Sequence, residues 1–203
     1  MLSTLAPNAL SIPAPNVLST PVALARINSF ALVTYIPDPL AEFLDGLRKE
    51  LVPGCSLRSH VSILPPRPLF ASEEAAQHQI ECECKRSPQF RIEAGIIRLF
   101  PVTNVIFIEV GTGENDLRRM HDSLNAGALE YEEPYCYHPH ITLAQQLPED
   151  LIGEGYELAS RRWAEYRHER GFDVVSITFV QNTIGNRWID LSEIRMGPLT
   201  KHP

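Results

Sequence analysis

Two short peptides in this chain, SHVSI and PHITL, share one alternation of polar and apolar positions. A period of two predicts a β-strand in each peptide. Because strand side chains alternate between faces, His60 and Ser62 lie on one face of the first strand, and His140 and Thr142 lie on one face of the second. The aliphatic residues between them point the other way. Each strand is therefore expected to bury an apolar face and to present an imidazole and a hydroxyl on the opposite face.

The rest of the pattern predicts the same order of elements twice: strand, helix, motif strand, helix, strand. We call each of the two occurrences a pass. The first pass comprises a strand at 30–36, a helix from 40 to about 54, the first motif strand, a helix at 72–85 and a strand at 90–100. The second comprises a strand at 105–110, a helix around 117–124, the second motif strand, a helix at 152–166, and closing strands at 173–181 and 187–194.

Glycine and proline add three local expectations. Asp38 followed by Pro39 predicts a helix N-cap with a proline in the first turn. Gly95, inside a strand pattern, predicts a β-bulge. The Pro-Pro-Arg-Pro run at 65–68 predicts a rigid loop that leaves the first motif strand.

Residues 1–27 differ from the rest, because they are rich in Pro, Ser, Ala and Asn and carry a single charge, Arg26. We expect a flexible tail there. Residues 28–203 are expected to form one α+β body, whose halves, about 28–102 and 103–203, each form a lobe. Pseudo-twofold packing of two such halves would bring the motif strands together across a central cleft.

Composition narrows the class of protein. The chain has 203 residues, 44% hydrophobic and 21% charged, with a net charge of −7. The negative charge argues against a protein that binds duplex DNA through an extended basic surface. No apolar run has the length of a membrane span, and the first residues lack the basic region of a signal peptide. We therefore expect a cytoplasmic protein without membrane association.

The four cysteines are too sparse for a disulfide scaffold. Cys82 and Cys84 form one conceivable metal pair, and His138 and His140 form another. Neither pair has the further ligands that a zinc site needs, and Cys84 falls at helical core spacing. We expect no metal and no cofactor.

Two imidazoles and two hydroxyls suit an in-line displacement at phosphorus. One imidazole can take a proton from the nucleophile, the other can give a proton to the leaving oxygen, and the hydroxyls of Ser62 and Thr142 can bind the phosphate. A lone His-x-Ser/Thr would signal little; the repeat makes it informative. The other histidines are expected at the surface or in packing: His78, His121, His138 and His168. Trp163 and Trp188 are expected in the core.

The chain resembles the two-histidine (2H) phosphoesterase superfamily in these two motifs. The first is His60-Val-Ser-Ile with the following proline run, and the second is Pro-His140-Ile-Thr-Leu-Ala. Within it, the bacterial 2′-5′ RNA ligase and cyclic phosphodiesterase group is the most similar, over about residues 29–195. The resemblance implies a bilobal α+β fold with antiparallel sheets facing a central cleft. It also implies metal-independent action on 2′,3′-cyclic phosphates or 2′-5′ linkages. Ser62 stands where the family more often has Thr.

The resulting hypothesis is hydrolysis of the 2′,3′-cyclic phosphate of a nucleotide or RNA end, with His140 as general base and His60 as general acid. The reverse reaction would be 2′-5′ ligation. Arg67 could bind the phosphate, and Tyr135 and Tyr137 could stack on a base. Two alternatives stay open: a phosphodiesterase for 2′-5′ oligonucleotides or ADP-ribose cyclic phosphate, and a non-catalytic module that binds nucleotides or RNA ends. We expect a monomer.

Overall fold

The computed structural model describes residues 24–198. Most of the predicted tail lies outside these residues. The first strand, β1 (Arg26–Tyr35), begins four residues before the expected position, so the predicted tail boundary at residue 27 is wrong: its last two residues belong to the body. None of the helices within 24–198 is long and apolar enough to cross a membrane.

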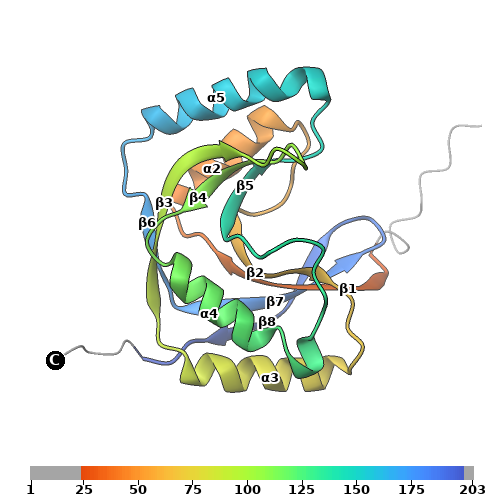
Figure 1. The fold of residues 1–203 in the computed structure, drawn as a ribbon. Helices are drawn as coiled ribbons and strands as arrows, with labels where there is room; N and C mark the ends of the chain where they lie inside the picture. Colours follow the sequence, from red (N-terminus) through yellow and green to blue (C-terminus); the bar gives the residue numbers. More distant parts are fainter. Residues whose placement is uncertain (1–23, 199–203) are drawn as a thin grey trace, which may run out of the picture.

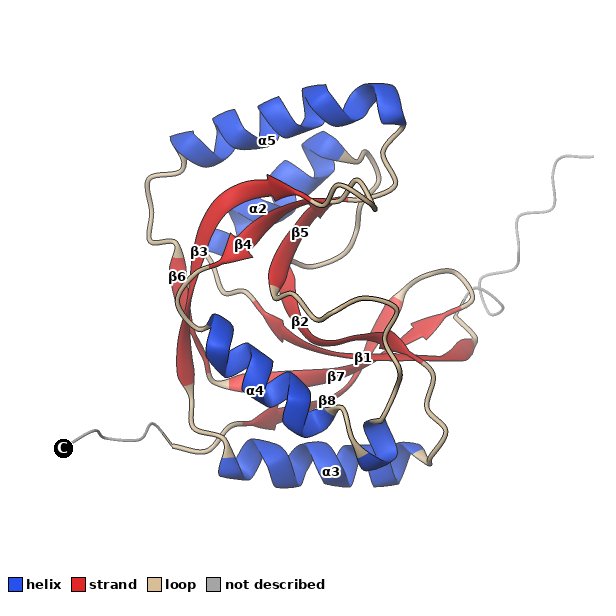
Figure 2. Cartoon of the chain, viewed as in Figure 1, coloured by secondary structure: helices blue, strands red, loops and turns tan. Residues whose placement is uncertain are grey.

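Two four-stranded sheets form the body, with strand orders β2-β1-β7-β8 and β5-β4-β3-β6 (Figures 1 and 2). Every neighbouring pair within them is antiparallel. Besides β1, the strands are β2 (His60–Arg67), β3 (Phe90–Leu99), β4 (Ile106–Val110), β5 (His140–Ala144), β6 (Gly171–Val174), β7 (Ser176–Thr183) and β8 (Trp188–Arg195). The α+β class and the antiparallel sheets agree with the expectation from sequence.

The third strand of each pass joins the sheet that contains the first two strands of the other pass. In the first sheet β7, from the second pass, pairs with β1; in the second sheet β3, from the first pass, pairs with β4. The orders β2-β1-β7 and β5-β4-β3 are therefore equivalent, as a duplication predicts. The predicted division into lobes between residues 102 and 103 is wrong, however, because each sheet contains strands from both halves.

The helices repeat this exchange. The helices are α2 (Leu40–Leu51), α3 (Glu73–Arg86), α4 (Glu114–Leu124) and α5 (Ile152–Glu165), with short 3-10 turns η1 (Gly127–Leu129) and η2 (Glu149–Leu151). Helix α2 packs against β5 of the second sheet, and α4 packs against β2 of the first. Helix α3 covers β7 and β8, and α5 covers β3 and β4 (Figure 1). Each motif strand is therefore supported by a helix of the other half.

Apolar side chains from both sheets and all four α-helices form one large core. Its largest fully buried members include Leu32, Leu44, Ile108 and Phe179. Trp163 is buried in this core, as expected, and its indole N–H donates to the carbonyl of Gly95 at 2.8 Å. Trp188 is only half-buried on β8, so its prediction as a core residue is wrong.

Of the three local expectations from glycine and proline, one is confirmed and two are wrong. The Gly95 bulge is present as a register shift between Ala94 and Ile97. Helix α3 begins at Glu73, one residue after the expected start, and its N-cap Ser72 accepts from the N–H of Ala75 at 3.2 Å. By contrast, the N-cap of α2 is Pro39 rather than Asp38, although the Asp38 carboxylate accepts from the N–H of Glu42.

The proline run does not end the first motif strand. Strand β2 continues through Pro65 and Pro66 to Arg67, which pairs with Phe30. Since β2 is an edge strand, its prolines do not have to donate to a second neighbour. The predicted strand at 173–181 is likewise divided at the exposed Val175, where the chain passes from the second sheet to the first. A pattern along the chain does not reveal which sheet each part joins.

Candidate active site

The two motifs begin two edge strands. His60 is the first residue of β2 and His140 is the first residue of β5. The intervening residues of each motif point into the core and are fully or almost fully buried: Val61, Ile63, Ile141 and Leu143. His60, Ser62, His140 and Thr142 are half-buried on the opposite faces. The alternation expected from sequence is present in both strands.

The structure also brings these two edges together. Strands β2 and β5 lie side by side although they belong to different sheets (Figure 1). The hydroxyl of Tyr137, just before the second motif, donates to the backbone carbonyl of Ser62 in the first motif at 2.8 Å. An edge strand has carbonyls without a ladder partner. Tyr137 uses one of them to join the two motifs.

Both catalytic candidates have the same imidazole orientation. Nδ1 of His60 lies 2.7 Å from the carbonyl oxygen of Arg58, and Nδ1 of His140 lies 2.7 Å from the carbonyl oxygen of His138. A carbonyl only accepts, so each Nδ1 carries the proton. In each neutral ring Nε2 is then the nitrogen left to accept a proton, and in each charged ring Nε2–H is the donor left for a ligand.

Burial lowers the pKa of both imidazoles. For His60, desolvation is the largest cause, and positive charges at Arg48 and His140 lower the pKa further, to about 4. For His140, desolvation again lowers the pKa, and His138 adds to the effect. The influence of His140 on His60 means that the two rings are within electrostatic range of each other. Protonation of one ring therefore disfavours protonation of the other.

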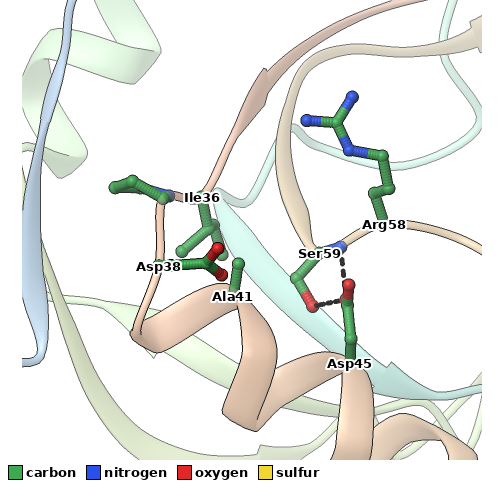
Figure 3. A pocket seen from close by; sticks show the side chains of 7 residues that line it. Ile36, Asp38, Ala41, Asp45, Arg58 and Ser59 are labelled. Atoms are coloured by element: carbon green, nitrogen blue, oxygen red, sulfur yellow. Dashed lines mark hydrogen bonds between the residues drawn. The ribbon is translucent and has the colours of Figure 1, made fainter.

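The surroundings of His60 are polar and charged. Asp45 on α2 accepts from both the N–H and the hydroxyl of Ser59, at 2.7 and 2.6 Å, and so fixes the residue before His60. Arg48, one turn further along α2, is 4% exposed, and its Nε and Nη1 have no hydrogen-bond partner in the described part of the chain. A cavity of about 310 Å³ lies beside this segment, and neither catalytic candidate lines it (Figure 3). Its lining residues are Ile36, Pro37, Asp38, Ala41, Asp45, Arg58 and Ser59.

The surroundings of His140 are aromatic. Phe100 and Phe107 stack on each other with ring centroids 3.9 Å apart. Both present their rings at a steep angle to His140, at centroid distances of 5.1 and 5.3 Å. His138 packs against the same two rings. Apolar rings cannot solvate a charge as water does, which is consistent with the lowered pKa of His140.

The two motif hydroxyls are available for a ligand. No side-chain hydrogen bond of Ser62 or Thr142 is formed among residues 24–198, although both side chains are only half-buried. Each stands two positions beyond its histidine on the same strand face. A phosphate placed between the histidines would therefore find a hydroxyl on either side.

The prediction that Arg67 binds phosphate is wrong for this structure. Arg67 is 3% exposed and its guanidinium is already occupied. It forms an ion pair with Glu133 and donates to Oδ1 of Asn125 at 2.6 Å and to the carbonyl of Leu129 at 3.2 Å. Because β2 extends past the prolines, this side chain is carried into the interior, where it holds the 125–133 segment.

The two tyrosines predicted to stack on a base differ. Tyr135 is 64% exposed. Tyr137 stacks in parallel on the buried His121, with ring centroids 4.0 Å apart, and burial raises its pKa. Nε2 of His121 lies 2.9 Å from Glu133, which also holds Arg67. Tyr137 is therefore a packing residue that fastens the second motif, and only Tyr135 keeps a free aromatic surface.

The remaining candidate ligands do not cluster. In residues 24–198, no three His, Cys, Asp or Glu side chains are grouped so that they could hold a metal ion. Cys84 is buried, as expected, and its pKa is raised by burial. His78, His138 and His168 are exposed.

Sequence reasoning missed several residues around the histidines. They are Tyr35, Asp45, Arg48, Arg58, Phe100 and Phe107. Only Arg48 left a signal, as a charged residue among the apolar positions of a helix stripe. Arg58 lies two residues before His60, outside the motif. The others reach the site through strand pairing and helix packing, which the local pattern does not encode.

Comparison with known proteins gives one consistent result. The profile of the 2′-5′ RNA ligase superfamily matches residues 36–185. A Geobacillus sp. (strain WCH70) protein named as a phosphoesterase is 31% identical over 107 residues, which cover 48% of this chain and 61% of that protein. A Bacillus licheniformis protein, also named as a phosphoesterase, is 25% identical over 147 residues, covering 71% of this chain and 85% of that protein.

Solved structures agree at the level of the fold. The crystal structure of a phosphoesterase superposes with a TM-score of 0.57 at 13% identity, covering 86% of this chain and 99% of its own. E. coli LigT complexed with 3′-AMP superposes with a TM-score of 0.56 at 15% identity, covering 83% and 97%.

Proposed function

Because the chain belongs to the 2′-5′ RNA ligase superfamily, we propose that it is a metal-independent phosphodiesterase that hydrolyses the 2′,3′-cyclic phosphates of nucleotides or RNA ends. The observation that carries this proposal is the pair of equally oriented imidazoles, each with Nδ1 bound to a backbone carbonyl and Nε2 left for proton transfer. Hydrolysis of a cyclic diester needs one proton acceptor and one proton donor on opposite sides of the phosphorus.

In this reaction Nε2 of the neutral histidine takes a proton from water. The water oxygen attacks phosphorus as one P–O bond of the cyclic ester breaks, and the ribose oxygen that leaves takes the proton from Nε2–H of the other histidine. The product is a phosphomonoester, and the two histidines have exchanged protonation states. Ser62 and Thr142 would donate hydrogen bonds to the non-bridging oxygens.

The charges around the two rings favour His60 as the base and His140 as the acid, the reverse of the assignment expected from sequence. The buried Arg48 disfavours a proton on His60 and does not act comparably on His140. His60 is therefore the ring that stays neutral, and the pair holds its one proton on His140.

A nucleotide substrate is supported by the solved relatives. E. coli LigT has been crystallised with 3′-AMP, ATP and NADP+. 3′-AMP is a phosphomonoester of the type that opening a 2′,3′-cyclic phosphate yields. We carry this ligand class over to the present chain as part of the proposal.

Product analysis on adenosine 2′,3′-cyclic phosphate tests the proposal directly. We expect a single adenosine monophosphate product, formed equally well in the presence of EDTA. Absence of turnover, with retained binding of the nucleotide, would instead favour the non-catalytic binding module. Loss of activity on chelation, restored by one added metal, would contradict the two-histidine mechanism.

The pH dependence gives a second test. The pH profile of kcat/KM should be bell-shaped, because one ring must be neutral and the other charged. Both pKa values are lowered in the free protein, so the optimum should lie on the acid side of neutrality. A bound phosphate stabilises the imidazolium, so the profile of kcat should lie at higher pH than that of kcat/KM. A profile that only rises through the neutral range would contradict the proposal.

A further inference from the structure

Arg58 and Tyr35 form a layered pair on the face of the first sheet that carries His60. Tyr35 on β1 is the direct cross-strand partner of His60 on β2. The two rings meet edge to face with centroids 6.4 Å apart. The guanidinium carbon of Arg58 lies 3.7 Å from the centroid of the Tyr35 ring. The guanidinium therefore lies over a tyrosine ring that itself contacts the catalytic candidate.

Asp190 on β8 fixes this pair from the side. Its carboxylate accepts from the hydroxyl of Tyr35 at 2.6 Å and lies 3.5 Å from Nη1 of Arg58. Burial and the neighbouring Asp190 raise the pKa of Tyr35, so the hydroxyl remains a donor. Because one carboxylate serves both side chains, the two are held in one arrangement.

The layered pair has a free surface. The Arg58 side chain is 61% exposed, although its guanidinium carbon lies over the Tyr35 ring. Below it, Tyr35 and the half-buried Trp188 pack against a small apolar cluster made of Ala31, Val33 and Val180. A rigid apolar base with a planar cation on top is a surface on which a flat, electron-rich ring can stack.

The pair is also joined to the reaction centre through the backbone. The carbonyl oxygen of Arg58 accepts from Nδ1–H of His60 at 2.7 Å. A ligand held on the guanidinium is thereby held at a constant position relative to the imidazole. The equivalent residue of the second motif, His138, lies instead against Phe100 and Phe107, so the layered pair is particular to the first motif.

We infer that the guanidinium of Arg58, supported by Tyr35 and fixed by Asp190, is the platform on which the nucleobase of the substrate stacks. This inference rests on the proposed function and assigns to Arg58 the stacking role that sequence reasoning gave to Tyr135 and Tyr137. Unpaired bases commonly stack on arginine planes as well as on aromatic rings, and such stacking tolerates any base. The substrate class is therefore a nucleoside cyclic phosphate with little base specificity.

The test compares two substrates that differ only in the base: adenosine 2′,3′-cyclic phosphate and methyl riboside 2′,3′-cyclic phosphate. The measured quantity is the ratio of their kcat/KM values, the base preference. Arg58→Lys keeps the charge and removes the plane, and Tyr35→Leu removes the ring beneath it. Each should lower the base preference at least about fivefold, the lower end of what one stacked base contributes. The double variant should lose little more than either single one.

Arg162→Lys is the matched control. Arg162 on α5 forms an exposed ion pair with Glu50 of α2 at 2.9 Å, and its replacement should leave the base preference unchanged. Equal losses on both substrates in Arg58→Lys would assign Arg58 to the phosphate and overturn the inference.

If the wild type hydrolyses neither substrate, the proposed function fails. The stacking platform is then tested by calorimetry, which compares the binding of 3′-AMP with that of ribose 3-phosphate. Tighter binding of 3′-AMP that Arg58→Lys abolishes would support the platform, and equal binding of the two would overturn it.

Discussion

His60 and His140 occupy equivalent positions in two equivalent sheets, and yet their neighbours have little in common. Both rings begin an edge strand and donate from Nδ1 to a carbonyl two residues earlier. Around His60 charged side chains act beside the single ring of Tyr35, namely Arg48 and Asp45 from α2. Around His140 the neighbours are aromatic.

This difference shows how a symmetric frame can perform an asymmetric reaction. The duplicated strand and its backbone hydrogen bond orient each imidazole in the same way. The side chains around the two strands differ: Arg48 and Asp45 of α2 act on His60, whereas two phenylalanine rings lie against His140. These neighbours set the relative proton affinity of the two rings. A general acid and a general base can then arise from one repeated motif.

The largest expected effect is the loss of either histidine. His60→Ala and His140→Ala should each lower kcat on the cyclic nucleotide by at least about a hundredfold, because each removes one proton-transfer group. His78→Ala, an exposed histidine on α3, is the control and should retain full activity. A near-normal kcat in either motif variant, at unchanged melting temperature, would refute the two-histidine mechanism.

The pH profiles of these variants sharpen the comparison between the rings. If His60 is the base, the residual activity of His60→Ala should depend only on a protonated His140 and so fall as pH rises. The residual activity of His140→Ala should depend only on a neutral His60 and so fall as pH decreases. The opposite pair of profiles would restore the assignment expected from sequence.

The hydroxyls should show a smaller effect. Ser62→Ala and Thr142→Val each remove one donor to the phosphate, which is expected to cost roughly 1–3 kcal/mol of transition-state stabilisation. Ser62→Thr is the matched control, because it keeps the hydroxyl and adds a methyl group. Steady-state kinetics would check this. Unchanged kcat/KM in both deletion variants would mean that the phosphate lies elsewhere.

The motifs were predictable because their information is local. A two-residue period specifies strand and face without knowledge of the rest of the chain, and the burial of Val61 and Ile141 agrees with it. Arg67 was misassigned because prolines commonly end a strand, whereas an edge strand tolerates them. Tyr35 and Asp190 could not be found, since their closeness to His60 depends on the register of β1 with β2 and on β8 joining the same sheet.

Arg48 tests the origin of the asymmetry. Arg48→Met keeps an apolar stem of similar length and removes a buried cation, so the pKa of His60 should rise from about 4 toward its ordinary value of 6.5. It should stay below 6.5, because desolvation remains the largest cause of the shift. NMR titration of His60 would measure this, with the exposed His78 as the internal reference. An unmoved His60 would remove Arg48 from the explanation.

The same shift affects stability, with a definite sign. A folded-state pKa below the unfolded value of 6.5 means that the unfolded chain binds the proton first as pH falls. The wild type should therefore lose stability between about pH 6.5 and pH 4, and Arg48→Met should lose less in that window. Denaturant unfolding at several pH values would check this, and identical slopes in the two proteins would contradict it.

The smallest expected effect concerns the joint between the two motifs. Tyr137→Phe keeps the ring stacked on His121 and removes only the hydrogen bond to the Ser62 carbonyl. That bond should contribute about 1 kcal/mol to the free energy of unfolding. If the hydrogen bond also sets the spacing of the two histidines, kcat should fall while KM changes little. The proton donor and acceptor would then be misplaced relative to a phosphate that still binds.

Tyr135→Phe is the matched control, because Tyr135 is exposed on the same segment. A loss of stability without any change in kcat would mean that the joint stabilises the fold and that the strands β2 and β5 hold the histidines in place without it.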